Sequence, residues 1–420
     1  MKTLLAAFYI SMVWAVLFAT GASAQTPPPN NEERMKAAPK AFIDCNICDM
    51  DFIRTEITFV SYVRDRKDAG VHVLVTTQAT GSNGTEYTLS FSGQGQFAGM
   101  NNVLQYVSNS TDTDAETRTG LVRILKAGLV AYAAKTPIAD RISVSYQDQV
   151  KPAEVKDRWN YWIFSINGNG NFDGEKQSRS SYLYGSFSAN RVTQGFKFRS
   201  SYSISKSTDR FSYGQDTLIS TSRSHGFNLL AVKSLADHWS AGASFNTSSS
   251  TYNNIDISVK AAPAIEYNFF PYSKSTRKQL RVLWKASYNY YRYNEETIFD
   301  KRSEGLWGEN VSVTLELKEK WGTIYNSFEA SHYFKDIAKN RMVLNSEVSI
   351  RLFKGLSFNL YGSYSRIRDQ LSLPKGEATL DEILLRRTQL ATSYRYYASI
   401  GLSYAFGSIF SNVVNPRFGN

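Results

Sequence analysis

Residues 394–406, with the sequence YRYYASIGLSYAF, decide the fold class of this chain. Aromatic and aliphatic side chains fill one alternate set of positions, while Arg, Ser and Gly fill most of the other set. Because successive side chains of a β-strand point to opposite faces, this alternation predicts a strand with one apolar and one polar face. Residues 255–269 (IDISVKAAPAIEYNF) and 280–290 repeat the pattern.

The same pattern recurs along the chain after residue 158 and predicts twelve strands. Their predicted ranges are 159–171, 180–190, 192–206, 217–234, 238–252, 254–270, 279–294, 308–319, 322–336, 339–353, 356–370 and 388–406. An even number of strands fits a closed antiparallel barrel with both chain ends on one side. Tight turns, such as Asn190-Arg191 and Lys354-Gly355, alternate with longer polar connections, such as 207–216 and 371–387. Pro263 lacks a ladder donor, so we expect a bulge there.

The alternative is a soluble all-β protein such as a sandwich or propeller. In soluble β-proteins, Tyr and Trp seldom lie near the ends of most strands. Here Trp239, Trp284, Tyr267 and Tyr404 lie near predicted strand ends on the apolar face, where a transmembrane barrel carries its aromatic girdles. The aromatic pattern therefore favours a transmembrane β-barrel over residues 159–406, followed by a tail at 407–420.

The N-terminus predicts export. Lys2 precedes an apolar stretch from Leu4 to Phe18, and Ala22-Ser23-Ala24 is typical of a signal-peptide cleavage site, so we predict a signal peptide over 1–24. Elsewhere in the 420 residues no apolar run reaches the roughly 18 residues of a membrane helix, which argues against a helical membrane protein. The Pro-rich stretch that follows predicts a linker over 25–40.

Charge separates the chain into two parts. Residues 25–150 have a net charge of −2 and residues 151–420 have +12, within a total of +11 that includes the charges of the signal peptide. This shift, with Pro152, predicts a boundary at 151–158.

The residues before that boundary, 41–150, predict a small α/β domain. Thr113 and Glu116 form a capping box before a helix that continues to about Ala134. Val71–Thr77 and Thr85–Phe91 predict a hairpin, Asp49–Val63 a helix, and Ile142–Tyr146 a closing strand. The expected element order is therefore α-β-β-α-β.

If the strands form a barrel, the charged residues of their polar faces point into its lumen. The predicted lumen-lining residues are Lys197, Arg199, Lys260, Glu266, Arg281, Lys285, Glu316, Lys318, Glu329, Glu347, Arg351 and Arg395. These charges could pair and fill the lumen, since unpaired buried charges are costly. The basic excess could instead line a narrow aqueous path that favours anions.

Residues 159–420 resemble bacterial outer-membrane β-barrel proteins, and the aromatic last strand is similar to the assembly signal of that class. Asp51–Phe91 (DFIRTEITFVSYVRDRKDAGVHVLVTTQATGSNGTEYTLSF) resembles the N-terminal region of uncharacterised barrel proteins from the same compartment. The resemblance implies an outer-membrane location with an N-terminal periplasmic domain. It also implies contact with outer-membrane lipid, lipopolysaccharide and the barrel-assembly machinery.

Other motifs give weak signals. Cys45 and Cys48 predict a local disulfide in an oxidising compartment, and His72 alone is too little for a zinc site. His225, His238 and His332 do not match the pattern of the outer-membrane phospholipases, which leaves a lipid hydrolase as a remote alternative. Export argues against nucleic acid as a partner, and no cofactor or metal is expected. Lys301, Arg302, Arg386 and Arg387 could contact lipopolysaccharide, although a solvated loop explains them as well.

Two functions follow from these expectations. The first is a narrow porin-like channel for small solutes, anions among them. The second is a non-conducting anchor whose periplasmic domain docks an envelope protein, because a domain of this size exceeds what a simple pore needs.

Overall fold

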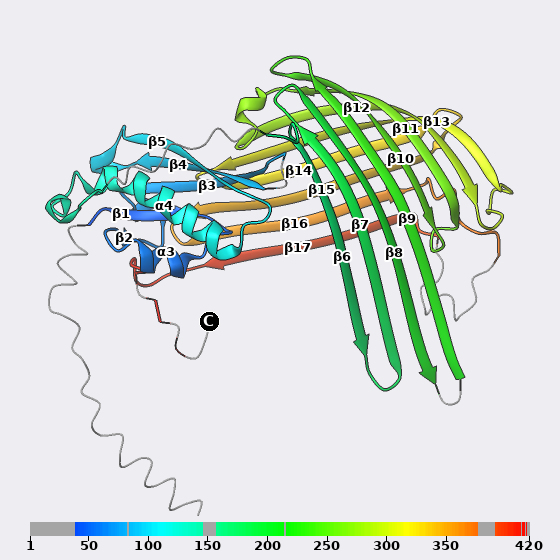
Figure 1. Ribbon diagram of the computed structural model, residues 1–420, viewed down its shortest axis with the longest axis horizontal. Helices are drawn as coiled ribbons and strands as arrows, with labels where there is room; N and C mark the ends of the chain where they lie inside the picture. The colour runs from blue at the N-terminus through cyan, green and yellow to red at the C-terminus, as the bar shows by residue number, and fades with distance from the viewer. Residues whose placement is uncertain are drawn as a thin grey trace, which may run out of the picture.

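The computed structural model describes residues 38–81, 84–145, 157–213, 216–376, 391–412, 414–415 and 417. The predicted signal peptide lies outside the described residues, as do most residues of the two predicted linkers. Arg386 and Arg387 also lie outside the described residues. The described residues form a five-stranded sheet and a twelve-stranded sheet (Figure 1).

The small sheet belongs to the N-terminal domain. Its strands are β1 (Lys40–Asp44), β2 (Ser61–Tyr62), β3 (Val71–Ala79), β4 (Thr85–Gly93) and β5 (Asn101–Ser108), in the order β2-β1-β3-β4-β5. β1 is parallel to β2 and β3, whereas β4 is antiparallel to β3 and β5. The helices are α3 (Met50–Glu56), α4 (Asp114–Ala133) and the 3-10 helices η1 (Arg66–Asp68), η2 (Gly95–Phe97) and η3 (Ala139–Arg141).

The core of this domain lies between the helices and the sheet. Leu125 and Leu129 of α4 are fully buried, as are Val73 of β3 and Leu89 of β4. The predicted capping box is confirmed: the Thr113 hydroxyl accepts from the backbone N–H of Glu116 at 3.2 Å, and the Glu116 carboxylate accepts from the backbone N–H of Thr113 at 2.8 Å. These two bonds satisfy donors that would otherwise be free at the start of α4.

The predicted element order of the small domain is wrong in part. The hairpin and α4 are confirmed, but the first helix ends at Glu56, and the β-branched residues that follow lead into β2. Residues 142–145 are not a strand, and the prediction missed β1 and β5. Between β1 and α3, the sulfur atoms of Cys45 and Cys48 lie at disulfide-bonding distance, as expected.

The large sheet is antiparallel, and each strand pairs with its neighbours in sequence. Its strands are β6 (Trp162–Gly174), β7 (Ser178–Val192), β8 (Phe196–Tyr213), β9 (Asp216–Ser234), β10 (Trp239–Ser250), β11 (Ile255–Asn268), β12 (Lys278–Tyr293), β13 (Ser303–Glu319), β14 (Gly322–Tyr333), β15 (Asp336–Phe353), β16 (Leu356–Ile367) and β17 (Tyr394–Tyr404). All twelve predicted strands are therefore present. The turn predicted at Asn190-Arg191 lies three residues later, at 193–195.

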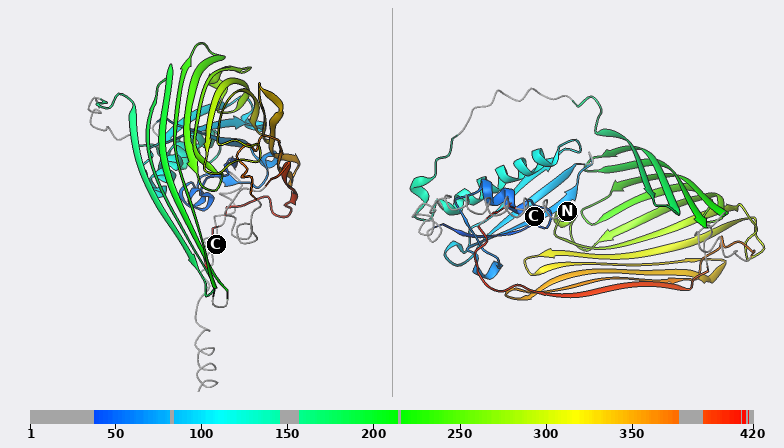
Figure 2. Two further views of the ribbon diagram at one scale, coloured as in Figure 1. Left: turned by 90° about the vertical axis from the view of Figure 1, so that its right-hand side faces the viewer. Right: turned by 90° about the horizontal axis from the view of Figure 1, so that it is seen from below.

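The large sheet is curved and strongly twisted, so β6–β9 run at a steep angle to β14–β17 (Figure 1). β6 and β17 are its two edges in the described part of the chain, and every residue of β17 is exposed. The β3–β4 hairpin reaches from the small domain towards β7 (Figure 2). The structure thus gives a twelve-stranded sheet with two free edges.

The predicted bulge at Pro263 is wrong. Pro263 pairs with Ala243 of β10 in regular register, and the register with β12 is the same on both sides of the proline. Around the proline, the pairing with β12 skips Ala262 and Pro263, which accommodates the missing donor without an extra residue. The register shift of this strand pair lies elsewhere, between Ile255 and Ile257.

The two faces of the large sheet differ in chemistry. We call the outer face the one whose large apolar side chains are exposed: Phe164, Ile166, Phe187, Tyr202, Ile204, Phe245, Ile265, Trp284, Trp307, Phe328, Leu344, Tyr364, Tyr396, Ile400 and Leu402. The inner face is polar and lies inside the curve, where Asn289, Asn310 and Thr314 are buried. No helix in the described residues has the length and apolar character needed to span a membrane.

Candidate functional site

The candidate site is the inner face of the large sheet together with the end of the sheet that meets the small domain. The strand register places all twelve predicted lumen-lining residues on the inner face. This follows from the two-residue period, which fixes the face of every residue once a strand is in register.

Several of these charges have inner-face partners on the same strand or on a neighbouring strand. Arg281 lies 3.6 Å from Glu266, and Lys318 lies 2.7 Å from Glu316. The Glu329 carboxylate accepts a hydrogen bond from Asn310 at 2.6 Å. Glu266 also accepts from the hydroxyl of Tyr272 at 3.0 Å, in the turn that contains η4 (Tyr272–Lys274). The acidic inner-face residues are thus largely held by local contacts.

The basic residues on β8, β11 and β12 are less compensated. Within the described residues, no carboxylate lies at ion-pair distance from Arg199, Lys260 or Lys285. Arg199 and Lys285 line a cavity of about 600 Å³, together with Asn246 and with Ala79 and Thr80 at the tip of the β3–β4 hairpin. This part of the inner face therefore presents positive charge to a space that is large enough for many water molecules.

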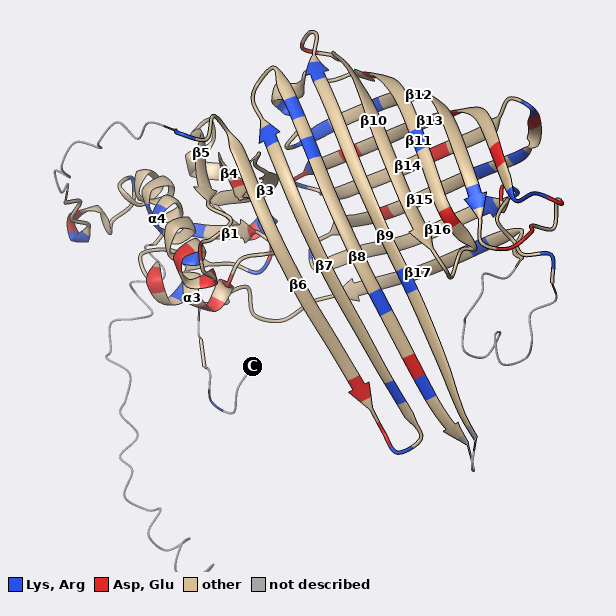
Figure 3. Cartoon of the chain, turned by 45° about the vertical axis from the view of Figure 1, so that its right-hand side comes forward, with Lys and Arg blue, Asp and Glu red and all other residues tan. Residues whose placement is uncertain are grey.

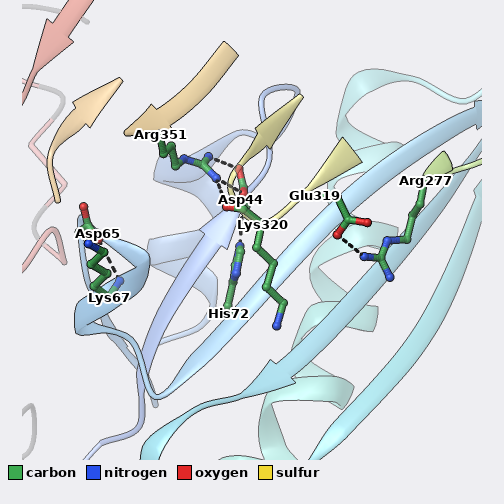
Figure 4. A network of polar contacts seen from close by, with 8 residues as sticks. All are labelled: Asp44, Asp65, Lys67, His72, Arg277, Glu319, Lys320 and Arg351. Atoms are coloured by element: carbon green, nitrogen blue, oxygen red, sulfur yellow. Dashed lines mark hydrogen bonds and ion pairs between the residues drawn. The ribbon is translucent and has the colours of Figure 1, made fainter. Parts of the chain in front are cut away.

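The small domain is held against the large sheet by an ion pair that the sequence did not predict (Figure 4). Both terminal nitrogens of Arg351, on β15, donate to the carboxylate of Asp44, on β1. Nε2 of the buried His72 lies 3.2 Å from the same carboxylate, and the guanidinium lies 5.4 Å from the centre of the Phe42 ring. Among the described residues, Arg351 is the one predicted lumen residue that forms an ion pair with the small domain.

Two further contacts lie at the turn after β15. Lys354 pairs with Asp68 at 2.6 Å, and the backbone N–H of Gly355 donates to Asp65 at 2.8 Å. Next to them, a cavity of about 450 Å³ is lined by Asp44 and Thr76 from the small domain and by Lys318, Ser349 and Arg351 from the large sheet. The small domain thus covers one end of the inner face, which we call the domain-side end.

The chain returns to the small domain after β17. The N–H of Arg64 donates to the carbonyl of Ile409 at 2.8 Å, and the N–H of Ser411 donates to the carbonyl of Tyr62 at 3.0 Å. Val63 and Phe410 form an antiparallel bridge. Part of the predicted C-terminal tail therefore pairs with the residues that follow β2 through an isolated bridge, and it connects the last strand to the small domain.

The electrostatics of Asp44 favour this docked arrangement. Burial alone would raise the pKa of Asp44, but the hydrogen bonds from His72 and Arg351 and the positive charge of Arg351 outweigh burial and lower the pKa below its ordinary value. The ionised carboxylate is thus the form that the site stabilises.

We expect the docked state to weaken in acid. Because the pKa of Asp44 is lowered, its contribution is complete above the ordinary Asp pKa of about 3.9 and is lost as the pH falls through the lowered value. Hydrogen exchange of the Ser411 and Arg64 amides, measured at several pH values and corrected for intrinsic rates, reports docking. The wild type should lose protection below about pH 4. The variant Asp44→Asn should lack this step, and the same acid step in both proteins would contradict the assignment.

Two of the histidines considered for a lipid hydrolase, His225 and His332, lie on the outer face of the large sheet. His332 lies 3.6 Å from Glu309 on the outer face, and its cross-strand neighbours are Glu309 and Asn340 rather than a hydroxyl residue. His225 is paired in register with Ser249, but the Ser249 hydroxyl donates to the carbonyl of Ile255 at 3.4 Å. No group of three or more His, Cys, Asp or Glu in the described residues is arranged to hold a metal ion.

A scan against protein-family models and a search of curated proteins find no match to this chain.

Proposed function

We propose that this chain is an integral outer-membrane β-barrel protein with its small domain in the periplasm. In this proposal β6 pairs with β17 in the bilayer, the outer face contacts lipid, and the inner face lines a narrow aqueous path for small solutes, with a preference for anions. The lipid hydrolase alternative gains no support from the histidine geometry.

The apolar outer face carries the membrane part of the proposal. Trp307 is 59% exposed, Ile400 is 71% exposed and Ile166 is 83% exposed, and these residues come from strands distributed across the whole sheet. Soluble monomers rarely expose contiguous apolar patches larger than a few hundred Å², so this surface needs a partner of its own size. Lipid is a suitable partner for the outer face. Unpaired backbone groups at a sheet edge are also unfavourable in lipid, so a lipid environment favours closure of the sheet into a barrel.

The uncompensated cations carry the pore part of the proposal. Twelve strands lie between the filled eight-stranded barrels and the open sixteen-stranded porins, so a narrow path is geometrically reasonable. Arg199, Lys260 and Lys285 would give such a path a positive lining, which favours anions.

The docked small domain supports the second candidate, a non-conducting anchor. Its hairpin tip lines the cavity at Arg199, and the Asp44–Arg351 pair holds it across the domain-side end. A path through the barrel would be obstructed at this end unless the small domain moves. The two candidates therefore differ in whether the domain is displaced during function.

Planar-bilayer recordings of the detergent-extracted full chain under a KCl gradient test the pore. We expect unitary steps with a reversal potential on the anion-selective side, which moves towards zero in the double variant Arg199→Gln/Lys285→Gln. The matched control Lys233→Gln/Arg366→Gln removes two outer-face charges and should leave the reversal potential unchanged. Absence of unitary current at all voltages would contradict the pore and favour the anchor.

A further inference from the structure

The outer face carries a cluster of four cations on β7, β8 and β9. Lys206 of β8 is directly opposite Arg223 of β9, and Arg179 of β7 is directly opposite Arg210 of β8. All four side chains are exposed, and Figure 3 shows Lys and Arg side by side on these strands. We call Arg179, Lys206, Arg210 and Arg223 the basic cluster.

The basic cluster has no acidic partner within the described residues. The other outer-face residues at this level are uncharged: Phe172, Ser181, Leu183, Thr208, Ile219 and Thr221. Like charges directly opposite one another destabilise a sheet, and here two such pairs lie four residues apart along β8. Intramolecular contacts therefore do not account for the cluster, whereas a bound anion would.

The position of the basic cluster matches the far interface of a bilayer. Phe196 begins β8 at the domain-side end, and Lys206 follows ten residues later. Ten residues of strand span about 33 Å, which at a tilt of about 40° is about 25 Å along the membrane normal, close to the height of the apolar band of such barrels. The outer-face residues of β8 between them, Phe198, Ser200, Tyr202 and Ile204, are uncharged.

We propose that the basic cluster binds the phosphate groups of an outer-leaflet phosphoglycolipid, whose acyl chains lie on the apolar band below. This inference rests on the proposed membrane location. Anionic phosphate matches the paired cations, and the apolar side chains on the domain side of the cluster match acyl chains. Lys301 and Arg302, the loop cations considered from the sequence, lie outside the strands, and Arg302 has Glu296 at 3.9 Å. They therefore serve as the comparison pair.

Binding of bis-phosphorylated lipid A to the detergent-extracted full chain tests this site. At about 5-fold per cation near the membrane surface, Lys206→Gln/Arg223→Gln should weaken binding roughly 25-fold. The charge-retaining variant Lys206→Arg/Arg223→Lys and the comparison variant Lys301→Gln/Arg302→Gln should stay within about threefold of the wild type. Dephosphorylated lipid A should bind the wild type as weakly as the neutralised variant binds the phosphorylated lipid.

Two outcomes would overturn the site while leaving the membrane proposal intact. One is that phosphorylated and dephosphorylated lipid A bind equally well to a protein that still migrates differently on gels before and after heating. The other is displacement of the lipid by inorganic pyrophosphate at equal phosphate concentration, which would indicate a simple anion site. A water-soluble protein without heat-modifiable migration would instead contradict the membrane proposal itself.

Discussion

Replacing Arg351 with Ala should undock the small domain. The Asp44 carboxylate, about one-tenth exposed, would keep His72 as its one side-chain partner among the described residues. Breaking a buried pair by removing one partner costs about 3–5 kcal/mol, because the remaining charge is left uncompensated. The undocked population should therefore rise by a factor of at least about 100.

Three backbone amides report this opening directly. The N–H groups of Arg64, Gly355 and Ser411 donate in contacts that join the two parts of the chain. Their hydrogen exchange should accelerate by about the same factor of 100 in Arg351→Ala, whereas the amides of α4 should keep their rates.

Lys354→Ala is the matched control for the same turn. Its pair with Asp68 is far more exposed, with 47% of the Lys354 side chain accessible, so its loss should cost less than about 1 kcal/mol. If hydrogen exchange accelerated equally in Arg351→Ala and Lys354→Ala, the Asp44–Arg351 pair would stabilise docking no more than the Lys354–Asp68 pair does.

Placing a charge at the centre of the outer face should have the second large effect. Leu344 is in the middle of β15, where its register neighbours are Phe328 and Tyr364. Arg at the midplane of the lipid-facing surface of a barrel costs about 2–4 kcal/mol. Leu344→Arg should therefore lower the free energy of unfolding from lipid vesicles by about that amount, measured by reversible urea denaturation.

The adjacent residue provides the control on the opposite face. Val343 lies on the inner face across from Glu329, so Val343→Arg would gain a carboxylate neighbour. Its free energy of unfolding should stay within about 1 kcal/mol of the wild type. If Leu344→Arg and Val343→Arg were equally mild, the outer face would be in water rather than in lipid.

The sequence predicts the large sheet well because the signal is local. Alternation such as that from Tyr394 to Phe406 depends only on the two-residue period of a strand, and it fixes both the strand and the face of each charge. β1 and β5 gave weaker signals, since β1 is a short strand and β5 exposes Val103 on a face that a soluble strand usually keeps polar.

Docking could not be predicted from sequence spacing. Asp44 and Arg351 are 307 residues apart, and neither belongs to a motif that points to the other. Alternation predicts that Arg351 lies on the inner face, but its partner depends on where the small domain lies. The bridge at Phe410 cannot be predicted for the same reason, because its partner, Val63, belongs to the other end of the chain.

Cysteine scanning along β15 tests the central claim most directly, because both native cysteines are in one disulfide. Single cysteines at positions 342–349 would be labelled in intact membranes with a water-soluble maleimide and with a lipid-soluble one. We predict a period of two: Met342, Leu344, Ser346 and Val348 react only with the lipid-soluble reagent, and the residues between them react with the water-soluble one. Equal labelling of both sets by the water-soluble reagent would contradict the account.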